Sequence, residues 1–168
     1  MGILSGNPKN QPMHYGEVFA VWSHLAGTKG MIAGYQTLAN HTGDRELKKF
    51  IEDVIQTMKQ ETEDIELLLK NNGIGLPPAP PERAKAALEQ IPSGARFNDP
   101  EISASIARDI AQGLVACSQI IGQCIREDIA MMFGQIHMGK AQFGAKLLRL
   151  NKEKGWLVMP PLHNQNFE

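Results

Sequence analysis

The sequence predicts an all-α protein, in which four long helices form two antiparallel hairpins joined by a proline-rich crossover. Three observations support this fold. Apolar residues recur every three or four positions over most of the chain, which is the spacing of one helix face. Prolines gather in one central stretch, residues 73 to 100, which also contains Gly73, Gly75 and Gly94. A glycine followed by paired prolines also closes two segments that lie 82 residues apart, at Gly73 and at Gly155.

The first helix is expected within residues 13 to 41. Its glycines weaken helix formation by up to about 1 kcal/mol each relative to alanine, so packing must stabilise it. Gly43 then suits a helix stop and Asp44 suits the N-cap of the next helix. The apolar stripe of this helix consists of Val18, Val21, Leu25, Ile32, Tyr35 and Ala39.

The second helix is expected from about Arg45 to Asn71, where Asn72 and Gly73 end it. Its stripe contains Leu47, Ile51, Val54, Met58, Thr62, Ile65, Leu68 and Leu69.

The stretch after Gly73 is too rich in proline for a long helix. A short helix is expected over residues 82 to 90, since alanine, leucine, lysine and glutamate favour helix and Pro81 suits a first helical position. Asp99 then reads as an N-cap and Pro100 as the first residue of the third helix.

From Ile102 to Leu150 an apolar stripe continues with no proline. A single helix of that length would extend about 75 Å, too long for a domain of this size to cover, so the segment must fold back. The 82-residue repeat places the bend near Gly122 to Arg126, the segment that corresponds to the turn at Gly43. We therefore expect one domain with hairpin one at 13–72, a crossover at 73–99, hairpin two at 100–154 and an extended tail at 155–168. Two hairpins with one long connection form the ferritin-like bundle topology.

Composition excludes several classes of partner. The 17 basic and 18 acidic residues are dispersed, which argues against a nucleic-acid partner. No apolar run of about 18 residues and no secretion-type leader occur, so membrane insertion is not expected and synthesis in the cytoplasm is. Cys117 and Cys124 lie seven residues apart on one expected helix, too far for a disulfide, and suit buried thiols.

Bundles of this topology often hold a di-metal centre built around Glu-x-x-His pairs. No such pair occurs here, and His14-x-x-Glu17 has the residue types in reverse order. A reduced site for zinc, iron or manganese is the alternative, since imidazole and carboxylate suit these metals. The simpler interpretation is hydrogen-bonded histidines at the edge of the core, so no cofactor is expected. The candidate ligands of the alternative site are His24, Glu61, Asp109 and His137.

Other chemistry has less support. Ser23 and His24 are adjacent and diverge by about 100° on a helix, so they form no dyad. Neither cysteine has a histidine at helical spacing to lower its pKa. No glycine-rich phosphate loop follows a strand. The pattern favours a protein without catalytic activity.

Three segments resemble a known family: the opening Gly16 to Ser23, the closure Leu67 to Pro78 and the closure Lys154 to Pro161. They are similar to ferritin-like bundle proteins of unknown function from Bacillus and related spore formers, commonly described as spore coat proteins. The Lys-Gly-Trp closure is similar to that of the coat protein F family. The resemblance covers essentially the whole chain and brings no catalytic residues. With only two tyrosines, the chain departs from coat proteins that assemble by cross-linking.

The resemblance implies a structural or interaction role in sporulating cells, in or beneath the spore coat, with other coat proteins as partners. The alternative function is a degenerate metal-binding oxidoreductase or metal carrier. Glycine-rich helix faces and the bulky termini around Trp156 and Phe167 predict a homodimer. The tail after Gly155 is expected to lie across the bundle and to bury the Trp156 indole.

Overall fold

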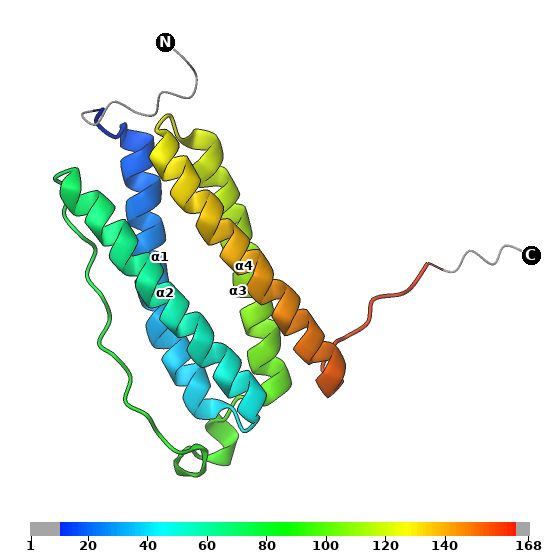
Figure 1. Ribbon diagram of the computed structural model, residues 1–168. Coiled ribbons are helices and arrows are strands. Elements are labelled where there is room, and N and C mark those ends of the chain that lie inside the picture. Colours follow the sequence, from blue (N-terminus) through cyan, green and yellow to red (C-terminus); the bar gives the residue numbers. More distant parts are fainter. Residues whose placement is uncertain (1–10, 164–168) are drawn as a thin grey trace, which may run out of the picture.

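The computed structural model describes residues 11–163 and contains four long α-helices (Figure 1). They are α1 (Tyr15–His41), α2 (Arg45–Asn71), α3 (Asp99–Gln123) and α4 (Glu127–Lys154), with two short 3-10 turns, η1 (Leu88–Gln90) and η2 (Ser93–Ala95), between α2 and α3. No strand occurs in the described range. The all-α prediction is confirmed, and the bend expected near residues 122 to 126 lies at 124–126.

The helices pair as α1 with α2 and α3 with α4, and the two hairpins meet through α1 against α3 and α2 against α4. The crossover runs the length of the molecule outside the α1–α2 hairpin, so α2 and α3 point the same way (Figure 1). This is the ferritin-like arrangement that the sequence predicts.

Local capping explains most helix starts. The Asp44 carboxylate accepts hydrogen bonds from the backbone N–H groups of Glu46 and Leu47, both at 2.9 Å. The N-cap of α3 is Asn98 and not the expected Asp99. The Asn98 side chain accepts a hydrogen bond from the Glu101 N–H, and the Glu101 carboxylate accepts one from the Asn98 N–H. That reciprocal box leaves Asp99 free to accept bonds from another segment.

The two hairpins end in the same way. Gly73 and Gly155 both adopt the left-handed conformation, at φ 72° and 71°. Each is followed by a residue whose N–H turns back to a helix carbonyl: Ile74 bonds to Leu69 at 3.0 Å, and Trp156 bonds to Asn151 at 2.9 Å. The echo in the sequence therefore corresponds to two glycine-closed helix ends 82 residues apart.

Side chains of α1 hold the crossover in place. The Trp22 Nε1–H donates to the Gly75 carbonyl at 2.9 Å, and the Lys29 ammonium donates to the Pro77 carbonyl at 2.8 Å. Further along, the Asn40 side chain bonds to Ala84 and Ala86. The short helix expected at 82–90 is wrong except for the 3-10 turn, because α1 side chains bind backbone groups that a helix would use itself.

The tail also departs from the prediction. Trp156 is half-buried against the core, but the chain beyond it leaves the bundle instead of lying across it (Figure 1). Val158 is 90% exposed. Phe167, invoked for dimerisation, lies outside the described residues.

Candidate functional site

The core of the bundle consists of two apolar clusters. One cluster surrounds Ile51 and Ile106 near the α1–α2 turn, and the other surrounds Leu25 and Phe133 at the opposite end. Lys140 of α4 is near one side chain from each of the other helices, and we call these four residues the interior polar cluster: His24, Glu61, Cys117 and Lys140.

An ion pair between α2 and α4 lies at the centre of this cluster. The Lys140 Nζ lies 3.4 Å from Glu61 Oε2, and both side chains are almost buried. The Lys140 stem runs against Gly113 of α3, where an added Cβ would come within 2.9 Å of Lys140 Cδ. The site is therefore shaped to hold a lysine, because a larger residue at 113 would collide with the stem.

Burial raises the pKa of Glu61, and the Lys140 ammonium partly offsets that rise. A carboxyl buried with a single cation is stabilised in its charged form only while that cation remains. The pair is thus interdependent.

His24 of α1 completes one side of the cluster. Its ring packs edge-on against Phe133, with centroids 5.0 Å apart, and its Nε2 is buried without a hydrogen-bond partner. Burial and, to a lesser extent, the Lys140 charge lower the pKa of His24 to about 4. The imidazole is therefore neutral at physiological pH.

The two cysteines are free, as expected from their spacing. Burial raises the pKa of Cys117 to about 11, which the neighbouring Lys140 charge reduces and the Glu61 charge increases. Burial likewise raises the pKa of Cys124 to about 11. Since the thiolate is the reactive form, neither thiol is activated as a nucleophile.

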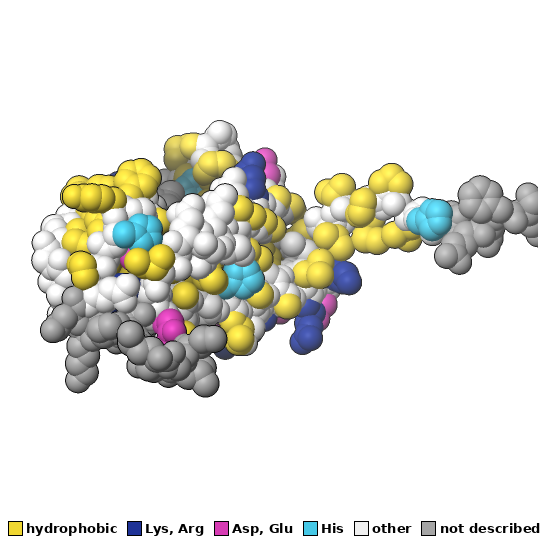
Figure 2. Space-filling view, turned by 90° about the horizontal axis from the view of Figure 1, so that it is seen from above, with side chains coloured by type: hydrophobic (Ala, Val, Ile, Leu, Met, Phe, Trp, Pro, Cys, Tyr) yellow, Lys and Arg dark blue, Asp and Glu magenta, His cyan; other side chains and the backbone are white. Residues whose placement is uncertain are grey.

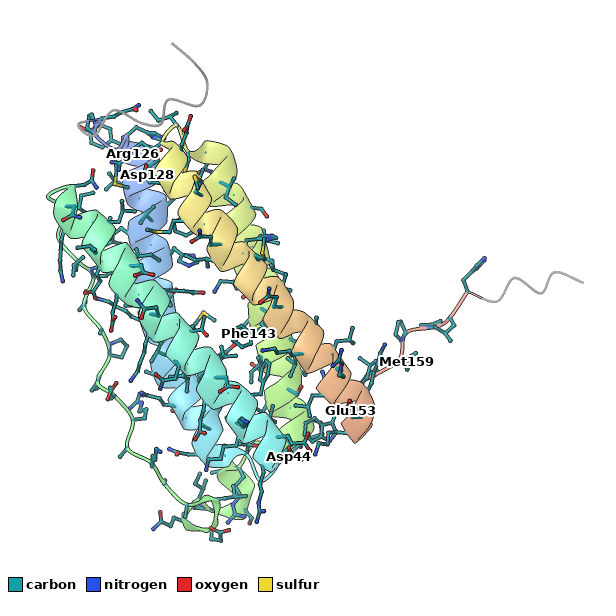
Figure 3. All side chains as sticks on the ribbon, viewed as in Figure 1. Asp44, Arg126, Asp128, Phe143, Glu153 and Met159 are labelled. Carbon is teal, nitrogen blue, oxygen red and sulfur yellow. The ribbon has the colours of Figure 1, made fainter. Side chains whose placement is uncertain are left out.

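A cavity of about 30 Å³ adjoins the cluster, with room for one or two water molecules. Glu61, Lys140 and Asp109 line it together with Tyr35 and Phe143. Figure 3 shows Phe143 directed from α4 toward the space between the hairpins. Burial raises the pKa of Asp109, an effect that Arg108 and the facing Tyr35 hydroxyl partly offset. The cavity is too small for an organic substrate.

The structure thus brings together only part of the predicted metal site. Glu61 and Asp109 line one cavity and His24 lies beside Lys140, whereas His137 is a half-buried residue elsewhere on α4. Within residues 11–163 there is no group of three or more His, Cys, Asp or Glu side chains that could hold a metal ion. Lys140 was not predicted as a site residue. A lysine between Ile136 and Phe143 on the apolar stripe nevertheless indicates a charge on the inner face of the helix.

His14 and Glu17 have a structural role at the end of the bundle. His14 caps α1 through its Nδ1, and Gly16 leaves room for the ring. The buried Glu17 carboxylate accepts from the N–H groups of Ile125 at 2.8 Å and Arg126 at 2.9 Å, and so caps α4, which has no side-chain cap of its own. Burial raises the pKa of Glu17, but hydrogen bonds from Arg126, His14 and Ile125 outweigh it and the net pKa is lowered.

Asp99 makes the reciprocal contact at the other end. It accepts from the Thr42 hydroxyl at 2.6 Å and from the Gly43 N–H at 3.1 Å, in the α1–α2 turn. Glu17 and Asp99 are 82 residues apart, so each hairpin supplies the acid that binds the other hairpin's turn.

No helix in the described part of the chain is both long and apolar enough to cross a membrane.

The chain is similar to two proteins from Bacillus species. It is 56% identical over 165 residues to the uncharacterized protein YvdQ of Bacillus subtilis (strain 168), covering 98% of this chain and 97% of that one. It is 60% identical, with a TM-score of 0.92, to a crystal structure described as a "putative spore coat protein" from Bacillus halodurans C-125, covering 95% of this chain and all of that one.

A more distant structure confirms the ferritin-like fold. The two-domain protein of Anabaena variabilis ATCC 29413, which contains DJ-1/ThiJ/PfpI-like and ferritin-like domains, is 16% identical with a TM-score of 0.64 and covers 98% of this chain and 43% of that one. The family model described as "Protein of unknown function (DUF3231)" matches residues 1–168. The resemblance seen in the two closures is confirmed, and the chain belongs to the DUF3231 family.

Proposed function

We propose that the protein is a non-enzymatic structural or interaction component of the bacterial spore, located in or beneath the coat. The observation that carries this proposal is the interior polar cluster. The Lys140 ammonium occupies the middle of the bundle and neutralises Glu61 there. The adjoining cavity leaves room only for water. An interior arranged in this way stabilises a scaffold and offers no site for a substrate.

The relative from Bacillus halodurans supports the location, because it matches nearly the whole chain at 60% identity. A fluorescently tagged copy expressed from its own promoter in a sporulating culture tests it. We expect a signal that begins during sporulation and forms a shell around the forespore, and recovery of the protein in coat extracts of purified spores. Expression confined to vegetative cells would contradict the proposal.

The second candidate is metal binding, which the buried and unpartnered His24 Nε2 near Lys140 favours. If Lys140 occupies part of a metal site, we expect protein grown with iron, zinc and manganese to retain one of these metals stoichiometrically. Lys140→Ala should then increase the amount of metal bound per chain. The matched control is His24→Leu in the same background, which removes the imidazole. Metal-free protein in all three forms excludes this candidate.

A further inference from the structure

The crossover covers the outer face of the α1–α2 hairpin. Depressions beneath it are lined by residues of α1 and α2 together with Ala79, Pro80 and Glu82 of the crossover. Several of these helix residues are charged, and Lys29 forms an ion pair with Glu66 at 2.8 Å while donating to the crossover. The helix positions that matter below are Lys29, Ala33, Gln36, Gln56, Lys59, Glu63 and Glu66.

The positions 82 residues further on form the corresponding face of α3 and α4, and nothing in the described chain covers them. All seven are exposed and none is charged. Val115 is 58% exposed, whereas its counterpart Ala33 beneath the crossover is 6% exposed. A shallow depression lies on this side, along α3 between Ala111 and Gln119. We call this the open face: Ala111, Val115, Ser118, Met138, Ala141, Ala145 and Leu148.

The segment that corresponds to the start of the crossover is the tail, residues 156–162. It leaves a helix end with the same glycine geometry, yet it does not turn back along its own hairpin. Instead it extends outward from the end of α4 (Figures 1 and 2), and Figure 3 labels Met159 on this segment, beyond the last turn of the helix. Val158, Met159 and Leu162 are 90%, 59% and 70% exposed.

Two apolar surfaces of one chain are therefore bare, and each has the chemistry to cover the other. At position 111 the open face has alanine, whereas the corresponding residue of α1, Lys29, donates a hydrogen bond to the crossover. The open face therefore suits an apolar segment that needs no polar anchor. Pro160 and Pro161 keep the tail extended before binding, which lowers the entropy lost on docking. Because the tail departs from its own bundle, a second copy supplies the partner surface.

We propose that the open face binds the C-terminal tail of a second copy, and that reciprocal exchange of tails forms a closed dimer. This does not depend on the proposed function in the spore. Sedimentation of the full chain at micromolar concentration is expected to show a dimer. Val115→Glu places a charge against the apolar tail, and removal of residues 158–168 deletes the tail, so each weakens association by at least about tenfold.

Two controls separate loss of binding from loss of folding. Leu67→Glu changes another exposed apolar residue, 59% exposed on α2, and leaves the dimer intact. At high dilution we expect the Val115→Glu and Leu67→Glu variants to have the same helical circular dichroism and the same thermal midpoint. The truncation keeps Trp156, which packs on the core.

A mixing experiment distinguishes exchange from docking within one chain. Val115→Cys protein is mixed with Met159→Cys protein under oxidising conditions, and wild type reports any background from Cys117 and Cys124. We expect a disulfide between the two different chains. A monomeric full chain, a dimer that survives the truncation, or a 115–159 disulfide that forms only within a doubly substituted chain would each overturn the proposal.

Discussion

A single ion pair neutralises the charges buried at the centre of the bundle. Lys140→Met leaves the Glu61 carboxylate without its cation, so we expect the free energy of unfolding to fall by about 3 kcal/mol. The double variant Lys140→Met/Glu61→Leu removes both charges and should recover most of that loss. Urea titrations of the wild type, both single variants and the double variant measure the coupling. Additive losses would show that the two side chains act independently.

His24 makes the stability depend on pH. Its pKa is lowered from 6.5 to about 4 in the folded state, so between these values the unfolded chain binds more protons than the folded one. Stability is therefore full above pH 6.5 and decreases as the pH falls toward 4. His24→Leu removes the titrating group and the unpartnered Nε2, and should be more stable than wild type at pH 5. Equal pH profiles of the two proteins would contradict this assignment.

At the scale of single elements, the start of α4 depends on a residue of α1. Glu17→Gln removes the negative charge that binds the N–H groups of Ile125 and Arg126, at an expected cost of about 1 to 3 kcal/mol at neutral pH. The pKa of Glu17 is lowered below 4.5 on folding. Its contribution is therefore present above pH 4.5 and lost as the pH falls through the folded-state pKa. The two proteins should converge in stability there.

The matched control is Glu101→Gln. Glu101 is the exposed acid at the corresponding position of the α3 box, and its carboxylate accepts from the N–H of Asn98 at its own helix start. Its substitution should cost less than that of Glu17, and denaturant titrations at several pH values measure both. An equal loss of stability in the two variants would mean that the hydrogen bonds between Glu17 and the second hairpin add nothing to stability.

The crossover is a second element held by α1. Lys29→Met removes the donor to the Pro77 carbonyl and one cation of Glu66, so hydrogen exchange in residues 77–98 should accelerate. Lys70→Met is the control, because Lys70 also pairs with Glu66, at 3.3 Å, but does not bond to the crossover. Faster exchange in both variants would point to Glu66 and not to the crossover bond.

Elements with strong local signals were predictable from the sequence, and elements held by distant partners were not. The bounds of α2 follow from the Asp44 cap and Gly73, both of which act locally. The failure at residues 82–90 has a tertiary cause, since Asn40 and Gln36 of α1 bind that backbone. The α4 cap could not be found locally, because its acceptor lies 108 residues earlier in the sequence.

The candidate site was predictable only in part for the same reason. Periodicity places Asp109 on the inner face of its helix, but the predicted stripe of the second helix has Thr62 and not Glu61. The cavity that Glu61 and Asp109 share therefore does not follow from periodicity alone. Periodicity does not show that Lys140 pairs with Glu61, because the space for the lysine stem depends on Gly113 of a third helix.

At the scale of the whole molecule, exchange of tails predicts that stability depends on protein concentration. A folded dimer that unfolds to monomers gains stability by mass action. The thermal midpoint of the full chain should therefore rise with concentration, while that of the chain lacking residues 158–168 should stay constant. Differential scanning calorimetry over roughly a hundredfold range of protein concentration measures both midpoints. A constant midpoint for the full chain would argue against association.

The reciprocal contacts of Glu17 and Asp99 have a consequence for synthesis of the chain. While the ribosome has delivered only α1 and α2, Glu17 lacks the Ile125 and Arg126 amides, and the Thr42 turn lacks Asp99. Hairpin one therefore leaves the exit tunnel with its end contacts unmade and its inner face uncovered. Cooperative folding of this protein is expected to begin only after the turn at residues 124–126 has emerged from the tunnel.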